Sequence, residues 1–163
     1  MSTDRGQYIG IDDNRLVHMR EVGRLCSELA FDLFGWNEHE CRQMFVMGFL
    51  HDIGYQFAEN QPDHEEIGGA LLASAKYEHA EPIRFHGDPE ADLSDDRLLI
   101  LNISDMAVSG DGKRVGFVTR LEDIATRYGK ESPQYETSAR VIAAIRAELK
   151  RRGLEVSLSD QNA

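Results

Sequence analysis

The sequence has few residues that could cross-link the chain or divide it into parts. Only two cysteines and four prolines occur among 163 residues. Cys26 and Cys41 lie in apolar, helix-like segments without Cys-x-x-Cys spacing, so we expect buried free thiols and neither a disulfide nor a zinc framework. Free thiols fit a reducing compartment. No repeat, low-complexity tract or Pro/Gly-rich linker is present, so one domain is expected.

Long hydrophobic runs and a basic excess are also missing. No stretch reaches about 18 consecutive apolar residues, and residues 1–10 contain no signal-peptide core. We therefore expect a cytoplasmic protein that binds no membrane. The 18 Lys and Arg stand against 29 Asp and Glu, a formal net charge of −11, which argues against nucleic-acid binding. A small phosphorylated substrate remains compatible, because a bound cation can reverse the field locally.

Strand patterns are absent, because no segment alternates apolar and polar residues over a strand's length. Apolar residues recur at helical spacing instead. Helices are predicted over 13–34, 37–52, 63–76, a short segment from Pro82, a segment from Leu98 to Val108, 115–128 and 133–152. The sequence thus predicts an all-α bundle of about six to seven helices over residues 13–152, with a flexible N-terminal tail at 1–12 and a C-terminal tail at 153–163.

Several predicted helical faces carry one residue of different chemistry. His18 shares an apolar face with Val22, Asp105 shares one with Leu101, and an apolar run leads directly into His51-Asp52. Burying such groups costs several kcal/mol unless they are paired or bind a metal. A lone histidine could be a hydrogen-bonded core residue. Inward-pointing histidines and carboxylates on separate helices are also what a metal centre inside a bundle requires.

The order of these residues resembles that of a known superfamily. His18, then His51-Asp52 in LHDIGY, then Asp105 in LLILNISDMAVS, is similar to the H…HD…D signature of the HD-domain metal-dependent phosphohydrolases, which are helical bundles. HEEIGGALL and EPIRFHGDP resemble the segments that supply two further histidines in dinuclear members. With all of these, the chain is most similar to the small bacterial HD hydrolases that split diadenosine tetraphosphate symmetrically.

The resemblance implies a defined set of metal ligands: His18, His51, Asp52, His64, His86 and Asp105. His64 and His86 would hold a second ion, and Asp52 would bridge the two ions and act as the catalytic residue. The resemblance implies one or two divalent transition metal ions. A mixed nitrogen and oxygen shell suits Fe or Mn, and also Co, Ni or Zn, better than Mg or Ca.

Three other residues are candidate substrate contacts. Lys113 and Arg114 lie in the loop GDGKR beyond Asp105, where the resembling dinucleotide hydrolases place an arginine. This loop could equally be a solvated turn. Tyr55 follows HDIG, where many HD proteins carry lysine or histidine. Together with the acidic loop 88–96, Tyr55 favours a monophosphate or another less charged substrate over a polyphosphate. The two remaining histidines are predicted to lie outside the site, His39 on the surface and His79 in a turn.

The resemblance implies hydrolysis of a phosphoester or phosphoanhydride, in a nucleotide or a related phosphorylated small molecule, by metal-activated water. Two alternatives stay open. A dinuclear iron oxygenase of the HD type would use the same ligands to cleave C–C or C–P bonds with dioxygen. A non-catalytic module would sense nucleotides or bind a partner. The amphipathic helix at 133–152 could form a homodimer or dock a partner, or it could pack against the bundle's own core.

Overall fold

The structure is a computed structural model, and it describes residues 8–158. Seven α-helices and two short 3₁₀ helices make up this part of the chain, which contains no β-strand. They are α1 (Asp13–Phe34), α2 (Glu38–Leu50), η1 (Ile53–Gln56), η2 (Gln61–Asp63), α3 (His64–Ser74), α4 (Ala80–Phe85), α5 (Asp96–Met106), α6 (Phe117–Tyr128) and α7 (Pro133–Arg152). The predicted all-α fold class is confirmed.

Capping residues fix several helix ends where the sequence predicts them. The Asn37 side chain accepts a hydrogen bond from the Glu40 N–H, and the Glu40 side chain accepts one from the Asn37 N–H, which completes a capping box at α2. The Ser132 hydroxyl accepts a hydrogen bond from the Tyr135 N–H and caps α7. Gly35 takes the left-handed conformation that ends α1.

Several helix boundaries differ from the prediction by one or two residues, among them the end of α2 and the start of α4. Helix α2 ends at Leu50, and the chain then turns into η1. Helix α4 begins at Ala80, so Pro82 is its third residue. Proline is tolerated there because the first N–H groups of a helix have no intrahelical partner. Pro82 therefore indicates the first turn of α4 without fixing its first residue.

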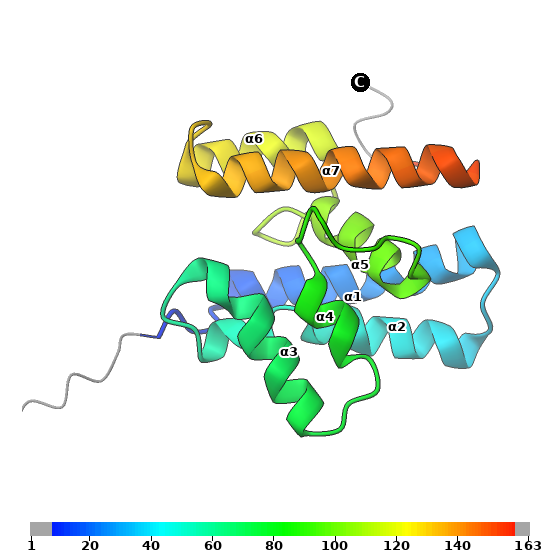
Figure 1. The fold of residues 1–163 in the computed structure, drawn as a ribbon, viewed down its shortest axis with the longest axis horizontal. Coiled ribbons are helices and arrows are strands. Elements are labelled where there is room, and N and C mark those ends of the chain that lie inside the picture. The colour runs from blue at the N-terminus through cyan, green and yellow to red at the C-terminus, as the bar shows by residue number, and fades with distance from the viewer. Residues whose placement is uncertain (1–7, 159–163) are drawn as a thin grey trace, which may run out of the picture.

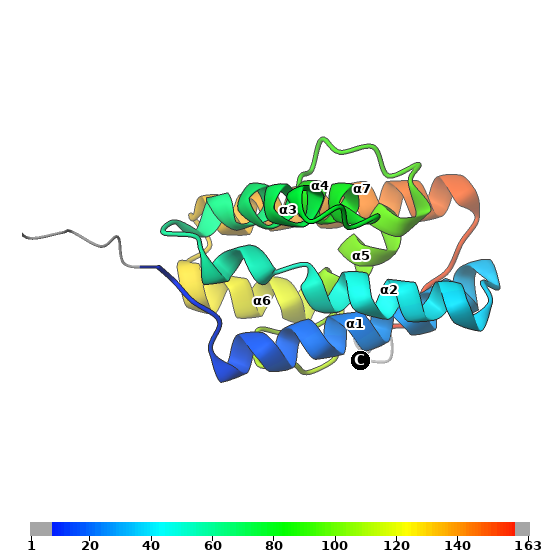
Figure 2. The same cartoon turned by 90° about the horizontal axis from the view of Figure 1, so that it is seen from below.

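Helix α5 lies at the centre of the bundle, and every residue from 98 to 106 is buried. It contacts α1, α2, α4 and α7. Figure 1 shows α6 and α7 side by side above α5, with α1 to α4 below. The view from below in Figure 2 shows α1 and α2 packed along one another. The core side chains that close around α5 include Met44, Met47, Ile83, Ile142 and Ile145.

Glycines allow α1 and α2 to approach closely near the predicted site. A Cβ on Gly48 would lie 2.8 Å from both the Gly23 Cα and the Cys26 Sγ. A Cβ on Gly23 would lie 2.7 Å from the backbone oxygen of Phe45. Side chains cannot be placed at such distances, so the crossing requires glycine on both helices. His18 and His51 lie close to this crossing in the sequence, and their ring centroids are 5.4 Å apart.

Parts of both predicted tails pack against the bundle. The Ile9 N–H donates to the Ala58 carbonyl at 2.9 Å, and Val156 and Leu158 belong to the hydrophobic core. The remaining tail residues, 1–7 and 159–163, lie outside the described residues. Cys26 and Cys41 are free and buried. Within residues 8–158, no helix is both long and apolar enough to cross a membrane.

Candidate metal centre

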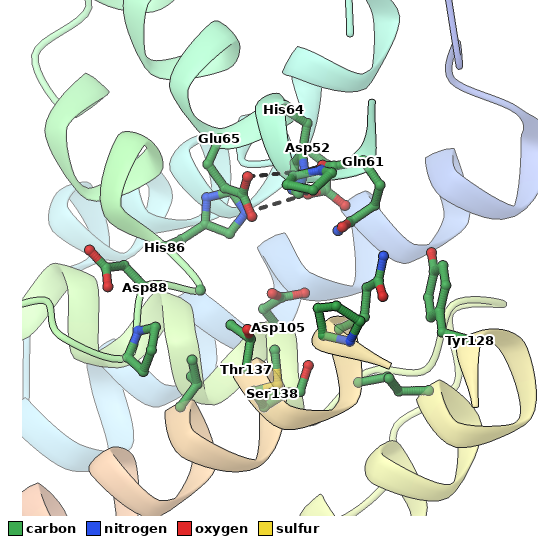
Figure 3. Close-up of a pocket in the computed structure, with 18 of the residues that line it drawn as sticks. Asp52, Gln61, His64, Glu65, His86, Asp88, Asp105, Tyr128, Thr137 and Ser138 are labelled. Atoms are coloured by element: carbon green, nitrogen blue, oxygen red, sulfur yellow. Dashed lines mark hydrogen bonds and ion pairs between the residues drawn. The ribbon is translucent and has the colours of Figure 1, made fainter. Parts of the chain in front are cut away.

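The predicted ligands converge on one place inside the bundle, although they come from five different helices or helix ends. Asp52 lies in the middle. Its Oδ1 is 3.3 Å from the Nε2 of His51, 3.2 Å from that of His64 and 3.5 Å from that of His86. Its Oδ2 is 3.7 Å from the Nε2 of His18. Figure 3 shows Asp52, His64 and His86 gathered on one side of a cavity.

Asp105 supplies a second buried carboxylate from α5. Its Oδ1 lies 3.0 Å from the Nε2 of His18 and 3.4 Å from the Nε2 of His51. Potential metal-binding side chains form three groups, and within each group the donor atoms all lie within 4.8 Å of one another. The groups are His18, His51 and Asp105; His51, Asp52 and His86; and His64, Glu65 and His86. The first two groups consist entirely of residues that the sequence predicts as ligands, and the third adds Glu65 to two of them.

Backbone carbonyls orient all four imidazoles in the same way. The Nδ1 of His18 lies 2.9 Å from the Ser109 carbonyl oxygen, and the Nδ1 of His51 lies 2.7 Å from that of Gly48. The Nδ1 of His64 lies 2.6 Å from the Gln61 carbonyl oxygen, and the Nδ1 of His86 contacts that of Ile83. A carbonyl can only accept, so Nδ1 carries a proton. A neutral imidazole then presents the Nε2 lone pair to the centre, which is the tautomer that binds a metal.

These orientations leave too many acceptors facing one another. Burial lowers the pKa of His18 and favours its neutral form, whose Nε2 lone pair then faces a carboxylate oxygen of Asp105. Within residues 8–158, the buried Nε2 of His51 has no hydrogen-bond partner. Converging lone pairs repel unless a positive charge lies between them. The side chains could therefore hold a metal ion.

Protons supply part of this positive charge when no metal is bound. Burial opposes a charged imidazole, but the hydrogen bond to Asp52 and the nearby carboxylates raise the pKa of His86 to about 9. Burial likewise opposes an ionised Asp52, yet His51 and Arg15 hold its pKa well below the usual range. The centre thus keeps a negative charge in its middle, and a metal ion would replace a proton there.

Arg15 and Tyr55 form one border of the centre. The Arg15 Nη1 lies 2.7 Å from the Asp52 Oδ2, and its guanidinium lies 4.1 Å above the Tyr55 ring. The Tyr55 ring stacks on His64 with centroids 4.0 Å apart. Burial and the nearby Asp52 raise the pKa of Tyr55, so its phenol stays neutral. Tyr55 lines the cavity, which is where a substrate contact is expected. Its side chain is only 4% exposed, because the ring packs between the Arg15 guanidinium and the His64 ring.

Lys113 and Arg114, which the sequence predicts as candidate substrate contacts, lie away from the centre. Arg114 pairs with Glu21 at 2.6 Å and Glu28 at 2.5 Å on the outside of α1. Lys113 is highly exposed and pairs with Asp111 at 3.2 Å. Neither residue lines the cavity. Their position along the chain predicts a role near Asp105. Arg114 instead forms ion pairs with carboxylates on α1, and these pairs hold its side chain outside the cavity.

The cavity beside the centre has a volume of about 460 Å³. Asp52, His64, Glu65 and His86 line one side, and Asp105 also lines the cavity. The other side is formed by α6 and α7, and Figure 3 shows Tyr128, Thr137 and Ser138 facing the centre from there. This volume is in the range of small-molecule sites, about 300–1,000 Å³.

Most acids of the 88–96 loop have structural partners. Asp95 caps α5 by accepting hydrogen bonds from backbone N–H groups, Asp96 pairs with Arg152, and Glu90 pairs with Arg140. Only Asp88 among them lines the cavity. The predicted conflict between this loop and a charged substrate is therefore much smaller than the sequence suggests.

Sequence reasoning missed several residues of the site. Arg15 could have been found, because it precedes His18 by three residues and so shares its helical face. Glu65 follows His64 directly, but adjacency alone does not indicate a ligand. Arg120 and Arg127 on α6 also line the cavity, and nothing in their local sequence relates them to the metal ligands.

The two histidines outside the predicted set also lie outside the centre. His39 is exposed, as predicted. His79 immediately precedes α4 and is buried, with its ring centroid 5.8 Å from that of Tyr77. It belongs to none of the groups of donor atoms found among residues 8–158.

Comparisons of the chain with protein-family models, with curated proteins and with solved structures found no match.

Proposed function

We propose that the protein is a metal-dependent phosphohydrolase of the HD type. Its substrate would be a nucleotide or a related phosphorylated small molecule with a phosphoester or phosphoanhydride bond. The observation that carries this proposal is the convergence of four imidazole Nε2 atoms and two carboxylates beside an open cavity. A cation bound there would lie next to a space large enough for a small ligand.

Two divalent transition metal ions, Fe or Mn in the first place, would match these donors. His18, His51 and Asp105 would hold one ion, and His64 and His86 would hold the second. Glu65 is a further candidate donor on the side of the second ion. Bound metal ions supply Lewis acidity, which lowers the pKa of a coordinated water and neutralises phosphoryl oxygens.

Asp52 is the proposed catalytic residue, because its carboxylate faces all four imidazoles. Oδ1 faces His51, His64 and His86, while Oδ2 faces His18 and accepts from Arg15. Asp52 can therefore orient the two halves of the centre and accept a hydrogen bond from the attacking water. Its low pKa keeps it ionised while it does so.

Arg15 is the proposed phosphate contact. The resemblance leads us to expect a cation near residue 55, and Arg15 places a guanidinium over the Tyr55 ring. Burial opposes its charge, but Asp52 raises the pKa of Arg15, so the group stays charged. A guanidinium offers five donors in a planar fork that suits phosphate oxygens. Tyr55 then acts as a positioning residue that holds Arg15 above His64.

The first test is metal content, measured by elemental analysis of protein purified without chelator and with air excluded. We expect about two transition metal ions per chain. A panel of phosphorylated compounds is then assayed for phosphate release and for oxygen uptake together. Release without oxygen uptake supports the hydrolase. Oxygen uptake without phosphate release would identify the dinuclear iron oxygenase instead.

Two variants make this test specific. Asp52→Ala should abolish phosphate release while circular dichroism shows an intact helical fold. The control is Asp32→Ala, which removes an exposed carboxylate from α1 and should leave the rate unchanged. If the wild-type protein binds the compounds but turns none of them over, the non-catalytic binding module replaces the hydrolase as the preferred function.

A further inference from the structure

Helix α6 carries two arginines at the cavity that the proposed hydrolysis does not use. Arg120 and Arg127 both line it. The Asp123 carboxylate holds them together: its Oδ2 accepts from Arg120 Nη1 at 2.7 Å, and its Oδ1 pairs with Arg127 Nε at 3.2 Å. The Gly110 N–H also donates to Asp123 Oδ2, at 3.2 Å. The two guanidinium groups are thus fixed in place next to the ligand space.

Arg120, Arg127 and Asp123 together keep an excess of positive charge, because two guanidinium groups pair with one carboxylate. Arg120 is only 8% exposed, and its Nε has no hydrogen-bond partner within residues 8–158. An unsatisfied donor on a nearly buried cation is unfavourable. Because both arginines line the cavity, an anionic group of a ligand there would supply the missing negative charge.

Gly110 allows Arg127 to take its position. A Cβ on Gly110 would overlap the Arg127 guanidinium, so that side chain lies directly against the Gly110 backbone. Gly110 follows Ser109, whose carbonyl oxygen lies 2.9 Å from the His18 Nδ1. The same loop therefore supports a metal-centre imidazole and the α6 arginines, which links the two parts of the cavity.

Apolar side chains line the same cavity. Met106, Ile124 and Val141 line the cavity together with the arginines and the metal-centre residues. Apolar lining suits the organic body of a ligand, and a few charged groups fix its orientation. The cavity of about 460 Å³ is of a size for one small molecule.

We infer that Arg120 and Arg127 bind a second anionic group of the substrate. The substrate is then a small phosphorylated compound that carries another phosphate, or a carboxylate, at a distance from the phosphoryl group at the metal centre. This inference rests on the proposed function, because the first phosphate is assigned to the metal centre. It revises the expectation of a less charged substrate, which the acidic 88–96 loop had suggested.

The test measures binding by calorimetry with the full-length, metal-loaded protein and with air excluded. The probes are phosphonates, whose C–P bonds are not hydrolysed: propylphosphonate against propane-1,3-diphosphonate, and hexylphosphonate against hexane-1,6-diphosphonate. 3-Phosphonopropionate tests a carboxylate as the second anion. Metal content is measured after each titration, so that extraction of metal by a probe is recognised.

We expect at least one probe with two anionic groups to bind the wild-type protein about tenfold more tightly than its partner with one. Arg127→Gln should reduce this gain to less than about twofold without weakening the single-anion probe, since one charge-assisted contact is lost. Gly110→Ala should also reduce the gain, because it displaces the guanidinium without changing any charge. Arg140→Gln removes a surface arginine that pairs with Glu90 and should keep the gain.

The inference is wrong if no second anionic group tightens binding to the wild-type protein, or if the gain survives in Arg127→Gln. The proposed function fails by a separate result, the absence of phosphate release from the panel of compounds. An Arg127-dependent gain without any turnover would support the anion site and refute the hydrolase.

Discussion

At the scale of single residues, the centre is defined by what each polar atom can donate or accept. Three of the four imidazoles lie with Nδ1 against the carbonyl oxygen of the residue three positions earlier, as His51 does with Gly48. Such local contacts fix the ring and leave Nε2 directed at the carboxylates. The chemistry of the site thus follows from short-range backbone geometry together with the identity of the side chain.

Removing the α5 carboxylate should affect one ion more than the other. Asp105 lies close to His18 and His51 but takes no part in the donor groups that contain His64 or His86. We expect Asp105→Asn to lower metal content from about two ions to about one per chain. Elemental analysis measures this, with Asp32→Asn as the control. Two ions retained in Asp105→Asn would show that Asp105 is not a ligand.

The buried thiol of Cys26 should be inert in the folded protein. Burial raises the pKa of Cys26 to about 12, and its side chain is fully buried. The thiolate is the reactive form, so at pH 8 at most one of the two thiols should react with a chromogenic disulfide reagent. Both should react after unfolding in guanidinium. Rapid reaction of two thiols in the native protein would contradict this prediction.

At the scale of elements, the site depends on how closely helices pack. Gly23 and Gly48 allow α1 and α2 to cross, and Gly54 does the same between η1 and α3, where a Cβ would overlap the His64 carbonyl. These contacts bring His18, His51 and His64 together, although 46 residues separate the first from the last (64 minus 18). Helix periodicity shows which face of a helix is buried but does not give the distance between two helices.

Gly48→Ala should therefore destabilise the protein and weaken its metal site. Forcing a methyl group into this crossing should cost about 1–3 kcal/mol of unfolding free energy, as overpacking commonly does. Urea denaturation measures the change, and a metal titration followed by calorimetry measures the affinity. Val46→Ala, at an exposed position of the same helix, is the control and should change stability by less than about 0.5 kcal/mol. An unchanged urea midpoint in Gly48→Ala would show that the helices adjust freely.

At the scale of the whole molecule, the centre connects helices that are distant in sequence. Its donors come from α1, α3, α5 and the C-terminal ends of α2 and α4. Helices α6 and α7 close the cavity from the other side, as Figure 3 shows. A metal ion bound here would hold five segments of the bundle together, so metal binding and global stability should be coupled.

Metal removal should lower the melting temperature of the whole bundle. An ion present at 1,000 times its dissociation constant adds about 4 kcal/mol of stability. For a chain of this size each kcal/mol shifts the melting temperature by about 2–4 °C, so we expect a fall of roughly 8–16 °C on dialysis against chelator.

Differential scanning calorimetry measures this shift, and adding the metal back should reverse it. Asp105→Asn should show a smaller fall, because it starts with fewer ions. A melting temperature that stays the same after complete metal loss would mean that the ions do not stabilise the folded state.

The sequence by itself determined the all-α class, most helix boundaries and the presence of polar residues such as His18 and Asp105 on apolar helical faces. These features depend on local capping, on helical periodicity and on polar residues that interrupt apolar faces, all of which can be read within a few residues. The full ligand set, including His64 and His86, was an expectation from the resemblance alone.

Only the tertiary structure decided what surrounds those donors. In the folded chain, Arg114 pairs with carboxylates on α1, and Arg15 lies beside Asp52. Arg120 and Arg127 line the cavity from α6, a helix far along the chain from the histidines. Side-chain partners of this kind depend on the distance and angle between packed helices. Local patterns do not encode these quantities, because they arise from the packing of the whole core.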